Sequence, residues 1–262
     1  MRLALYLACA VRLATTVGAA PVVDGCINGI ALSRVIYINM DHRKDRRRVM
    51  ERNLANLPVP VQRFVGPRVS FDEAKSLLPN RWQTPGWQMA RLTGAAGCLM
   101  SKLAVLRAYL AEHQAQQRSN STRPPRTFSG TVLILEDDWR IIQPERLLSH
   151  LGSLLTRAIR SGQMACRPNL VRLDCWGMKR TQSEGSCDAS SVVGRCRCGG
   201  THAMLVPTWG LLSLIKLYER KLGAADCVLP NLPKNYCLNA GIMKAEQSLR
   251  NMSDIPKGRN PN

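Results

Sequence analysis

Apolar residues along the chain form two patterns, short uninterrupted runs and stripes at helical spacing. The short runs are typical of strands that are buried on both faces of a sheet. We predict strands at residues 34–39, 61–64, 131–135, 169–174 and 201–206. In the stripes, apolar residues recur every three or four positions, which places them on one face of a helix. We predict helices from within 41–48 to about 57, and at 93–113, 144–162 and 209–221.

Strands and helices therefore alternate along most of the chain. This order favours an α/β fold with a mainly parallel sheet flanked by helices. The chain has 262 residues and shows neither a repeat nor a clear internal boundary, so we expect a single domain over residues 30–256. The irregular segment 66–91, the polar segment 114–130 and the Cys/Gly-rich segment 181–200 are expected to be loops, the second of them mobile.

Three acids follow the most apolar of these strands. The run Thr131–Leu135 ends in Glu136, Asp137 and Asp138, where open α/β sheets bind their ligands. Residues i and i+2 of a strand point to the same side, so Glu136 and Asp138 are expected to face one way and Asp137 the other. Two carboxylates on one side can bind Mn²⁺ or Mg²⁺. The alternative is an acidic turn exposed to solvent.

A dense basic segment follows the first predicted strand. Residues 41–48 read Asp-His-Arg-Lys-Asp-Arg-Arg-Arg and lead into a helix. The amides and dipole of a helix N-terminus favour an anion, and arginine can form two hydrogen bonds with phosphate oxygens. Arg43 and Arg46 are therefore candidates for binding phosphate. The alternative is a basic helix end that is exposed to solvent.

The charge balance points to anionic partners. The chain holds 37 Lys and Arg against 18 Asp and Glu, a formal net charge of +19. Such a surface attracts nucleic acid, anionic glycans, acidic lipids or phosphate-bearing substrates, and charge does not choose among them. Aromatic residues make up 5% of the chain and show no pattern typical of single-strand binding proteins. No apolar run approaches the roughly 18–20 residues of a membrane span.

The N-terminus and the cysteines favour the secretory pathway. Arg2, the apolar run 3–11 and the small residues at 17–20 resemble a signal peptide over residues 1–20, with an ordinary helix as the alternative. We therefore expect the endoplasmic reticulum or Golgi lumen, or secretion, and no nucleic-acid partner. Ten cysteines favour disulfides over zinc, because their spacing lacks the pairs of common zinc modules. Asn120 begins a glycosylation pattern.

Several separated motifs resemble glycosyltransferase family 25, which contains bacterial lipopolysaccharide galactosyltransferases and animal procollagen galactosyltransferases. The first two are Ile38–Arg47, similar to INLDxRxDRR, and Leu92–Thr93 with Gly97–Ser101, similar to LTxGEIGCxxSH. The next two are Leu133–Asp138, similar to LILEDD, and Gly200–Ala203, similar to GTxAYL. The last two are Asp226, similar to the acid of PVD, and Gln247 with Ser253–Ile255, similar to QxxxxSxI. They occur in the family's order from about residue 34 to 255.

The resemblance implies an A-type glycosyltransferase fold and an inverting, metal-dependent transferase. The donor implied is UDP-galactose, and the acceptor is a hydroxyl of a glycan or glycoprotein, which the basic surface suggests is anionic. Glu136 and Asp138 would bind Mn²⁺ or Mg²⁺. Asn39, Arg43, Arg46 and Lys102 would bind the nucleotide sugar.

The implied reaction also needs a base to accept the proton of the acceptor hydroxyl. Asp226 is the first candidate and Asp174 the second. The family's Glu and His are replaced here by Ala95 and Lys102. Lysine can bind phosphate but cannot act as a neutral imidazole. These departures motivate the alternative of an inactive relative that serves in adhesion or binds polyanions.

Overall fold

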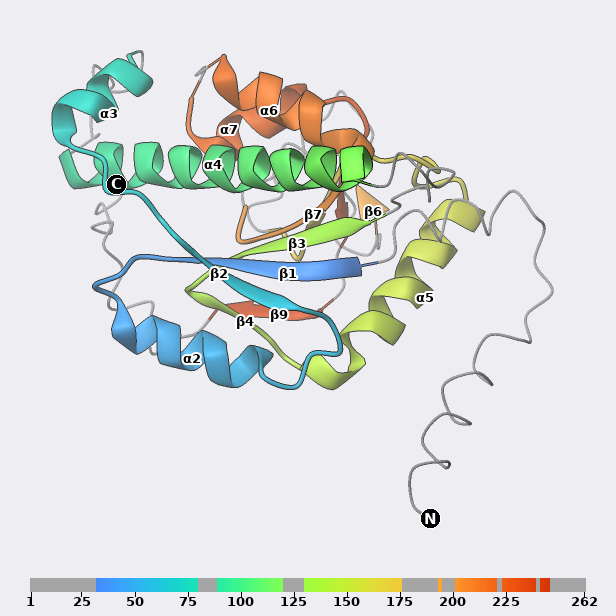
Figure 1. Ribbon diagram of the computed structural model, residues 1–262. Coiled ribbons are helices and arrows are strands. Elements are labelled where there is room, and N and C mark those ends of the chain that lie inside the picture. Colours follow the sequence, from blue (N-terminus) through green and yellow to red (C-terminus); the bar gives the residue numbers. More distant parts are fainter. Residues whose placement is uncertain are drawn as a thin grey trace, which may run out of the picture.

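A central mixed sheet organises the computed structural model, which describes residues 32–79, 89–119, 130–175, 193–194, 201–220, 223–238 and 241–245 (Figure 1). Its seven described strands lie in the order β2-β1-β3-β7-β5-β8-β6. They are β1 (Leu32–Asn39), β2 (Val61–Val65), β3 (Thr131–Glu136), β5 (Leu170–Leu173), β6 (Val193–Gly194), β7 (Ala203–Pro207) and β8 (Asn235–Leu238). The pairings β2–β1, β1–β3 and β5–β8 are parallel, whereas β7 and β6 run against their neighbours. The expected α/β fold with a mostly parallel sheet is confirmed.

Several predicted features lie outside the described residues. They are the signal peptide 1–20, the glycosylation site Asn120, most of the loops 114–130 and 181–200, and the motif at 247–255.

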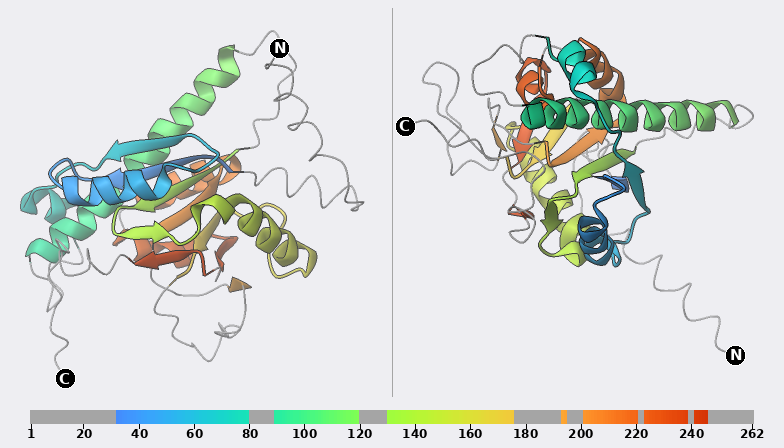
Figure 2. Two further views of the ribbon diagram at one scale, coloured as in Figure 1. Left: turned by 90° about the horizontal axis from the view of Figure 1, so that it is seen from below. Right: turned by 90° about the vertical axis from the view of Figure 1, so that its left-hand side faces the viewer.

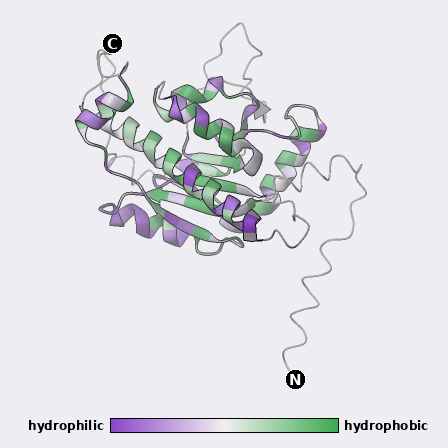
Figure 3. Ribbon diagram, turned by 45° about the horizontal axis from the view of Figure 1, so that its top comes forward, coloured by the Kyte–Doolittle hydropathy of each residue, from purple (hydrophilic) through white to green (hydrophobic). Residues whose placement is uncertain are grey.

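Helices cover both faces of the sheet (Figure 1). One face packs against α2 (Lys44–Leu54) and α5 (Leu147–Arg160). The other packs against α3 (Phe71–Leu77), α4 (Met89–Ser119), α6 (Leu211–Glu219) and α7 (Ala225–Val228). In Figure 3 the central strands are hydrophobic, whereas α2 is mostly hydrophilic because only a narrow stripe of it faces the sheet.

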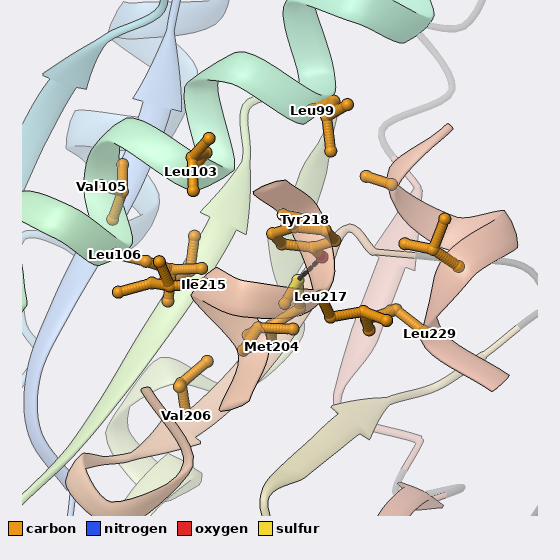
Figure 4. Close-up of a cluster of buried hydrophobic side chains, with 14 of the residues drawn as sticks. Leu99, Leu103, Val105, Leu106, Met204, Val206, Ile215, Leu217, Tyr218 and Leu229 are labelled. Carbon is orange, nitrogen blue, oxygen red and sulfur yellow. Dashed lines mark hydrogen bonds between the residues drawn. The ribbon is translucent and has the colours of Figure 1, made fainter. Parts of the chain in front are cut away.

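The alternation of side chains along each strand creates two cores. In β3, Val132 and Ile134 belong to the cluster beneath α4 and α6, and Leu133 and Leu135 to the cluster beneath α2 and α5. Figure 4 shows part of the first cluster, where residues of α4, β7 and α6 interdigitate. A strand with both faces buried is apolar at every position, which is why Thr131–Leu135 could be recognised in the sequence.

The structure corrects the predicted boundaries and adds short elements. Segment 66–91, predicted to be irregular, contains α3, which begins with a capping box formed by Ser70 and Glu73. The helix predicted at 93–113 extends over the whole of α4. The strands β4 (Trp139–Ile141) and β9 (Met243–Ala245) form a separate two-stranded sheet. The remaining short elements are η1 (Pro144–Arg146), η2 (Thr208–Gly210) and η3 (Leu229–Asn231).

The long helix α4 crosses one face of the sheet and extends past the strands (Figure 2). By length and composition alone, its segment Met89–Gln116 could cross a membrane, the one such helix in the part of the chain described here. Its apolar residues Leu99, Leu103 and Leu106 are buried in the core. Packing against the sheet therefore accounts for the apolar character of α4.

A disulfide joins the ends of two neighbouring strands. Cys175 follows β5 and bonds Cys237 of β8, 62 positions away. Cys166 is also disulfide-bonded. The prediction of disulfides is confirmed for Cys175 and Cys237. The bond links the chain on either side of the segment that contains β7 and α6.

Gly210 marks a close approach of two backbones and gives a first prediction. A Cβ atom at Gly210 would lie 2.1 Å from the carbonyl oxygen of Asn169, so this contact tolerates no side chain. We expect Gly210→Ala to lower the free energy of unfolding by about 1–3 kcal/mol, measured by urea denaturation.

Gly152 in α5 is the matched control, because a Cβ there meets nothing within 4 Å. Gly152→Ala is expected to stabilise the protein by about 0.5–1 kcal/mol, since alanine is the better helix former. Equal effects of the two substitutions would contradict the packing argument.

Candidate functional site

A pocket of about 520 Å³ lies at the carboxyl ends of β1 and β3. The turn after β1, the segment after β2, the first turns of α4 and the acids after β3 form its walls. The charged and titratable residues of the lining are His42, Arg46, Arg68, Cys98, Lys102, Glu136, Asp137 and Asp138. The pocket therefore brings together four of the predicted site residues: Arg46, Lys102, Glu136 and Asp138.

Asp137 is the most firmly held of the three acids. Its Oδ1 accepts a hydrogen bond from Arg46 Nη1 at 2.8 Å, and its Oδ2 accepts one from Asn39 Nδ2 at 2.6 Å. The side chains of Arg46 and Asp137 are only 9% and 10% exposed. This ion pair joins α2 to the end of β3. Arg46 therefore lines the pocket with its charge already balanced by Asp137.

Asn39 and Arg43 shape the turn between β1 and α2. Asn39 Nδ2 also donates to the carbonyl oxygen of Arg43, and Arg63 Nε donates to Asn39 Oδ1. Arg43 forms two hydrogen bonds with Asp45, which lower the pKa of Asp45 to about 2. Both Asn39 and Arg43 are buried and absent from the pocket lining. Within the structure they support the turn that carries Arg46.

Lys102 and Glu136 form an ion pair at the base of the pocket. Lys102 Nζ donates to Glu136 Oε1, which also accepts a hydrogen bond from Thr201 Oγ1 at 2.9 Å. Lys102 lies one turn after Cys98 on α4, and its side chain is 1% exposed. Burial alone would lower the pKa of Lys102, but its interactions with Cys98 and with the carboxylate of Glu136 raise it above its usual value. Lys102 is therefore charged at neutral pH.

The same ion pair keeps Glu136 ionised. Burial alone would raise the pKa of Glu136, but the ammonium of Lys102 and the hydrogen bonds from Lys102 and Thr201 hold it well below its usual value. Cys98 Sγ also donates to Glu136 Oε1, at 3.4 Å. Burial raises the pKa of the free Cys98 thiol to about 11, so it is not a thiolate at neutral pH.

Asp138 is the acid with the fewest partners. Its Oδ1 is buried and accepts no hydrogen bond from any residue that the structure describes. Burial, followed by the negative charge of Glu136, raises the pKa of Asp138 to about 6. A buried carboxylate oxygen without a donor beside a pocket is suited to accept a proton or to contact a ligand.

The residues present fit the implied divalent cation poorly. A cation at Glu136 would lie beside the buried ammonium of Lys102, and the two positive charges would repel each other. Glu136 Oε1 is also occupied by its three donors. Among the described residues no group of three or more His, Cys, Asp or Glu is arranged to hold a metal. Asp138 is the one acid of the pair that forms no ion pair among the described residues, although the charge of Arg46 lowers its pKa.

The structure does not bring the two candidate bases to this pocket. Asp174 accepts three backbone hydrogen bonds, from Gly241, Ile242 and Met243, at 2.6–2.7 Å. It therefore holds the segment before β9. Asp226 lies in the first turn of α7 and is not part of the pocket lining. The role of either acid as a base remains a prediction.

Sequence reasoning missed two basic residues of the pocket, His42 and Arg68. Arg68 and His42 line the pocket, and Arg68 Nη2 lies 3.5 Å from His42 Nδ1. Both are exposed, and neither belongs to an apolar pattern that would have marked it. His202 is buried and stacks on Trp139, with ring centroids 3.5 Å apart. Burial lowers the pKa of His202, which favours its neutral form as a packed residue.

Comparison with known proteins adds no assignment. No protein-family model matches this chain, and a search of curated proteins finds no significant match. The functional conclusion therefore rests on the residues of the site and on the motifs that resemble glycosyltransferase family 25.

Proposed function

We propose that this protein is an inverting glycosyltransferase that binds a nucleotide sugar in the pocket at the ends of β1 and β3. The proposed donor is UDP-galactose, and the proposed acceptor is a hydroxyl of a glycan or glycoprotein. The observation that carries this proposal is the meeting of the two most specific motifs of the resemblance, around Arg46 and around Glu136–Asp138, at one pocket. They are about 90 positions apart in the chain and joined by the ion pair of Arg46 and Asp137.

The location and charge of the pocket support this proposal. Ligands of open α/β sheets bind outside the carboxyl ends of the strands, which is where this pocket lies. Residues of α4 at helical spacing, among them Ala90, Thr93 and Gly97, line one wall of the pocket. Arg68 has no carboxylate partner among the described residues, so its guanidinium is available to a phosphate group.

The same arrangement suggests how the acceptor is handled. A carboxylate beside the donor can accept the proton of the attacking hydroxyl. Asp138 lines the pocket, whereas Asp174 is committed to backbone amides. The proposed cellular location is the lumen of the secretory pathway, because the chain carries disulfides as well as a signal-like N-terminus.

Binding of UDP by the purified protein tests this function. We expect Arg68→Ala to weaken UDP binding about 10- to 100-fold in a calorimetric titration, because it removes a charge-assisted hydrogen bond. Arg160→Ala is the matched control, since Arg160 is an exposed arginine at the end of α5 and outside the pocket lining. The control should bind UDP like the original protein. Absence of UDP and UDP-galactose binding in the original protein would overturn the proposed function.

A second candidate function is a non-catalytic module that binds polyanions. Lys102 stands where the family has a histidine and neutralises Glu136, and the net charge of +19 favours polyanions. Such a module would bind heparin with an affinity that falls steeply as salt is added, and would not bind UDP. A glycosyltransferase would bind UDP in competition with UDP-galactose and release UDP when an acceptor is added.

A further inference from the structure

Glu136 forms an ion pair with the ammonium of Lys102, whereas in a metal site its carboxylate would bind the metal ion. Glu136 Oε1 is held by the ammonium of Lys102, the hydroxyl of Thr201 and the thiol of Cys98. Lys102 and Cys98 belong to α4, and Thr201 lies shortly before β7. Two separate segments of the chain therefore hold this oxygen. The arrangement is internally balanced, with one buried positive charge on one carboxylate.

A divalent cation at the same place would have to compete with that ammonium. The Lys102 side chain is buried and forms an ion pair with Glu136. A cation would then share the carboxylate of Glu136 with the ammonium of Lys102, and the repulsion between the two positive charges disfavours the cation. Asp138 would be left as the main ligand, without the second carboxylate that the motif supplies in the sequence.

The pocket nevertheless retains a positive charge for an anionic ligand. Arg46 is balanced by Asp137 and Lys102 by Glu136. Arg68, by contrast, is exposed, lines the pocket and forms no ion pair with a carboxylate among the described residues.

We propose that this pocket binds a nucleoside diphosphate without a divalent cation. Lys102 occupies the place at Glu136 that a cation would take, and Arg68 supplies the positive charge that meets the diphosphate. This inference rests on the proposed function, because it concerns the same pocket and the same ligand. In this proposal the ammonium of Lys102 takes the place of the Mn²⁺ or Mg²⁺ that the family resemblance implies.

The test is a calorimetric titration of the intact protein with UDP, once in EDTA and once in MnCl₂. We expect the two dissociation constants to differ by less than about threefold. A titration with MnCl₂ alone should show no saturable binding. UDP binding that requires Mn²⁺ would overturn this inference and leave the proposed function standing. Absence of UDP binding in both buffers would overturn the proposed function itself.

A substitution at Lys102 gives the inference a second readout. Lys102→His removes the permanent positive charge and frees Glu136, so UDP binding should become at least about tenfold tighter in MnCl₂ than in EDTA. Lys216→His is the control, because Lys216 is exposed on α6 and outside the pocket lining; it should remain insensitive to the metal. Metal-insensitive binding by a folded Lys102→His protein would overturn the role given to Lys102. If that variant does not fold, the comparison of EDTA and MnCl₂ on the original protein decides.

Discussion

Replacing Asp137 by alanine is expected to lower the free energy of unfolding by about 3–5 kcal/mol. The reason is the buried guanidinium of Arg46, whose side chain is 9% exposed and which donates to Asp137 at 2.8 Å. Without the carboxylate, this buried positive charge loses its ion-pair partner Asp137. Asn39 also loses the acceptor of its 2.6 Å hydrogen bond. Most of the expected loss in unfolding free energy comes from leaving the Arg46 charge buried without Asp137. This loss is larger than the net contribution of the ion pair to stability.

Urea denaturation of Asp137→Ala against the original protein measures this effect. Asp41→Ala is the control, because Asp41 pairs with Arg63 but its side chain is 72% exposed. An exposed pair of this kind contributes about 0–1 kcal/mol. The double variant Arg46→Met with Asp137→Ala should recover most of the loss, since it removes both charges. Equal and small losses for Asp137→Ala and Asp41→Ala would show that the pair at Arg46 is not buried in solution.

The sequence correctly predicted a strand that ends in three acids. It did not predict which partner each of the three acids binds. Alternation along a strand places Glu136 and Asp138 on one side, and both line the pocket. Asp137 lines it as well, because the strand ends at Glu136 and the next two residues form a turn. Strand periodicity does not apply beyond the last paired residue. Asp137, which the strand pattern placed on the opposite side from Glu136 and Asp138, is the acid that binds Arg46.

Partners across long sequence distances could not be predicted. Lys102 and Glu136 are 34 positions apart, and only the packing of α4 over β3 brings them together. Asp174 has a positive φ of 48° and binds three amides more than 60 positions away. A strand ending in an acid looks the same in sequence whether the acid binds a ligand or the backbone. The buried runs, by contrast, could be predicted because their pattern is local.

Asp138→Asn is expected to stabilise the protein at neutral pH. The pKa of Asp138 rises from 3.8 to about 6 in the folded state, because burial and the charge of Glu136 disfavour its ionised form. The folded protein therefore holds this proton more tightly than the unfolded chain does. The resulting stabilisation is complete below the unfolded pKa and is lost as pH rises through about 6. At pH above this range the original protein bears a penalty of up to about 3 kcal/mol, which asparagine avoids.

The measurement is the difference in unfolding free energy between Asp138→Asn and the original protein, in EDTA, from acidic to neutral pH. The difference should be near zero below the unfolded pKa of Asp138 and should grow to its full value above a pH of about 6. Carboxylates that do not interact with Asp138 titrate equally in both proteins and cancel. A difference that does not change with pH would refute the raised pKa. Asp138→Asn is also expected to abolish galactose transfer from UDP-galactose. If stability rises while this activity is lost, the unpaired oxygen of Asp138 lowers stability but is needed for the chemistry of the pocket.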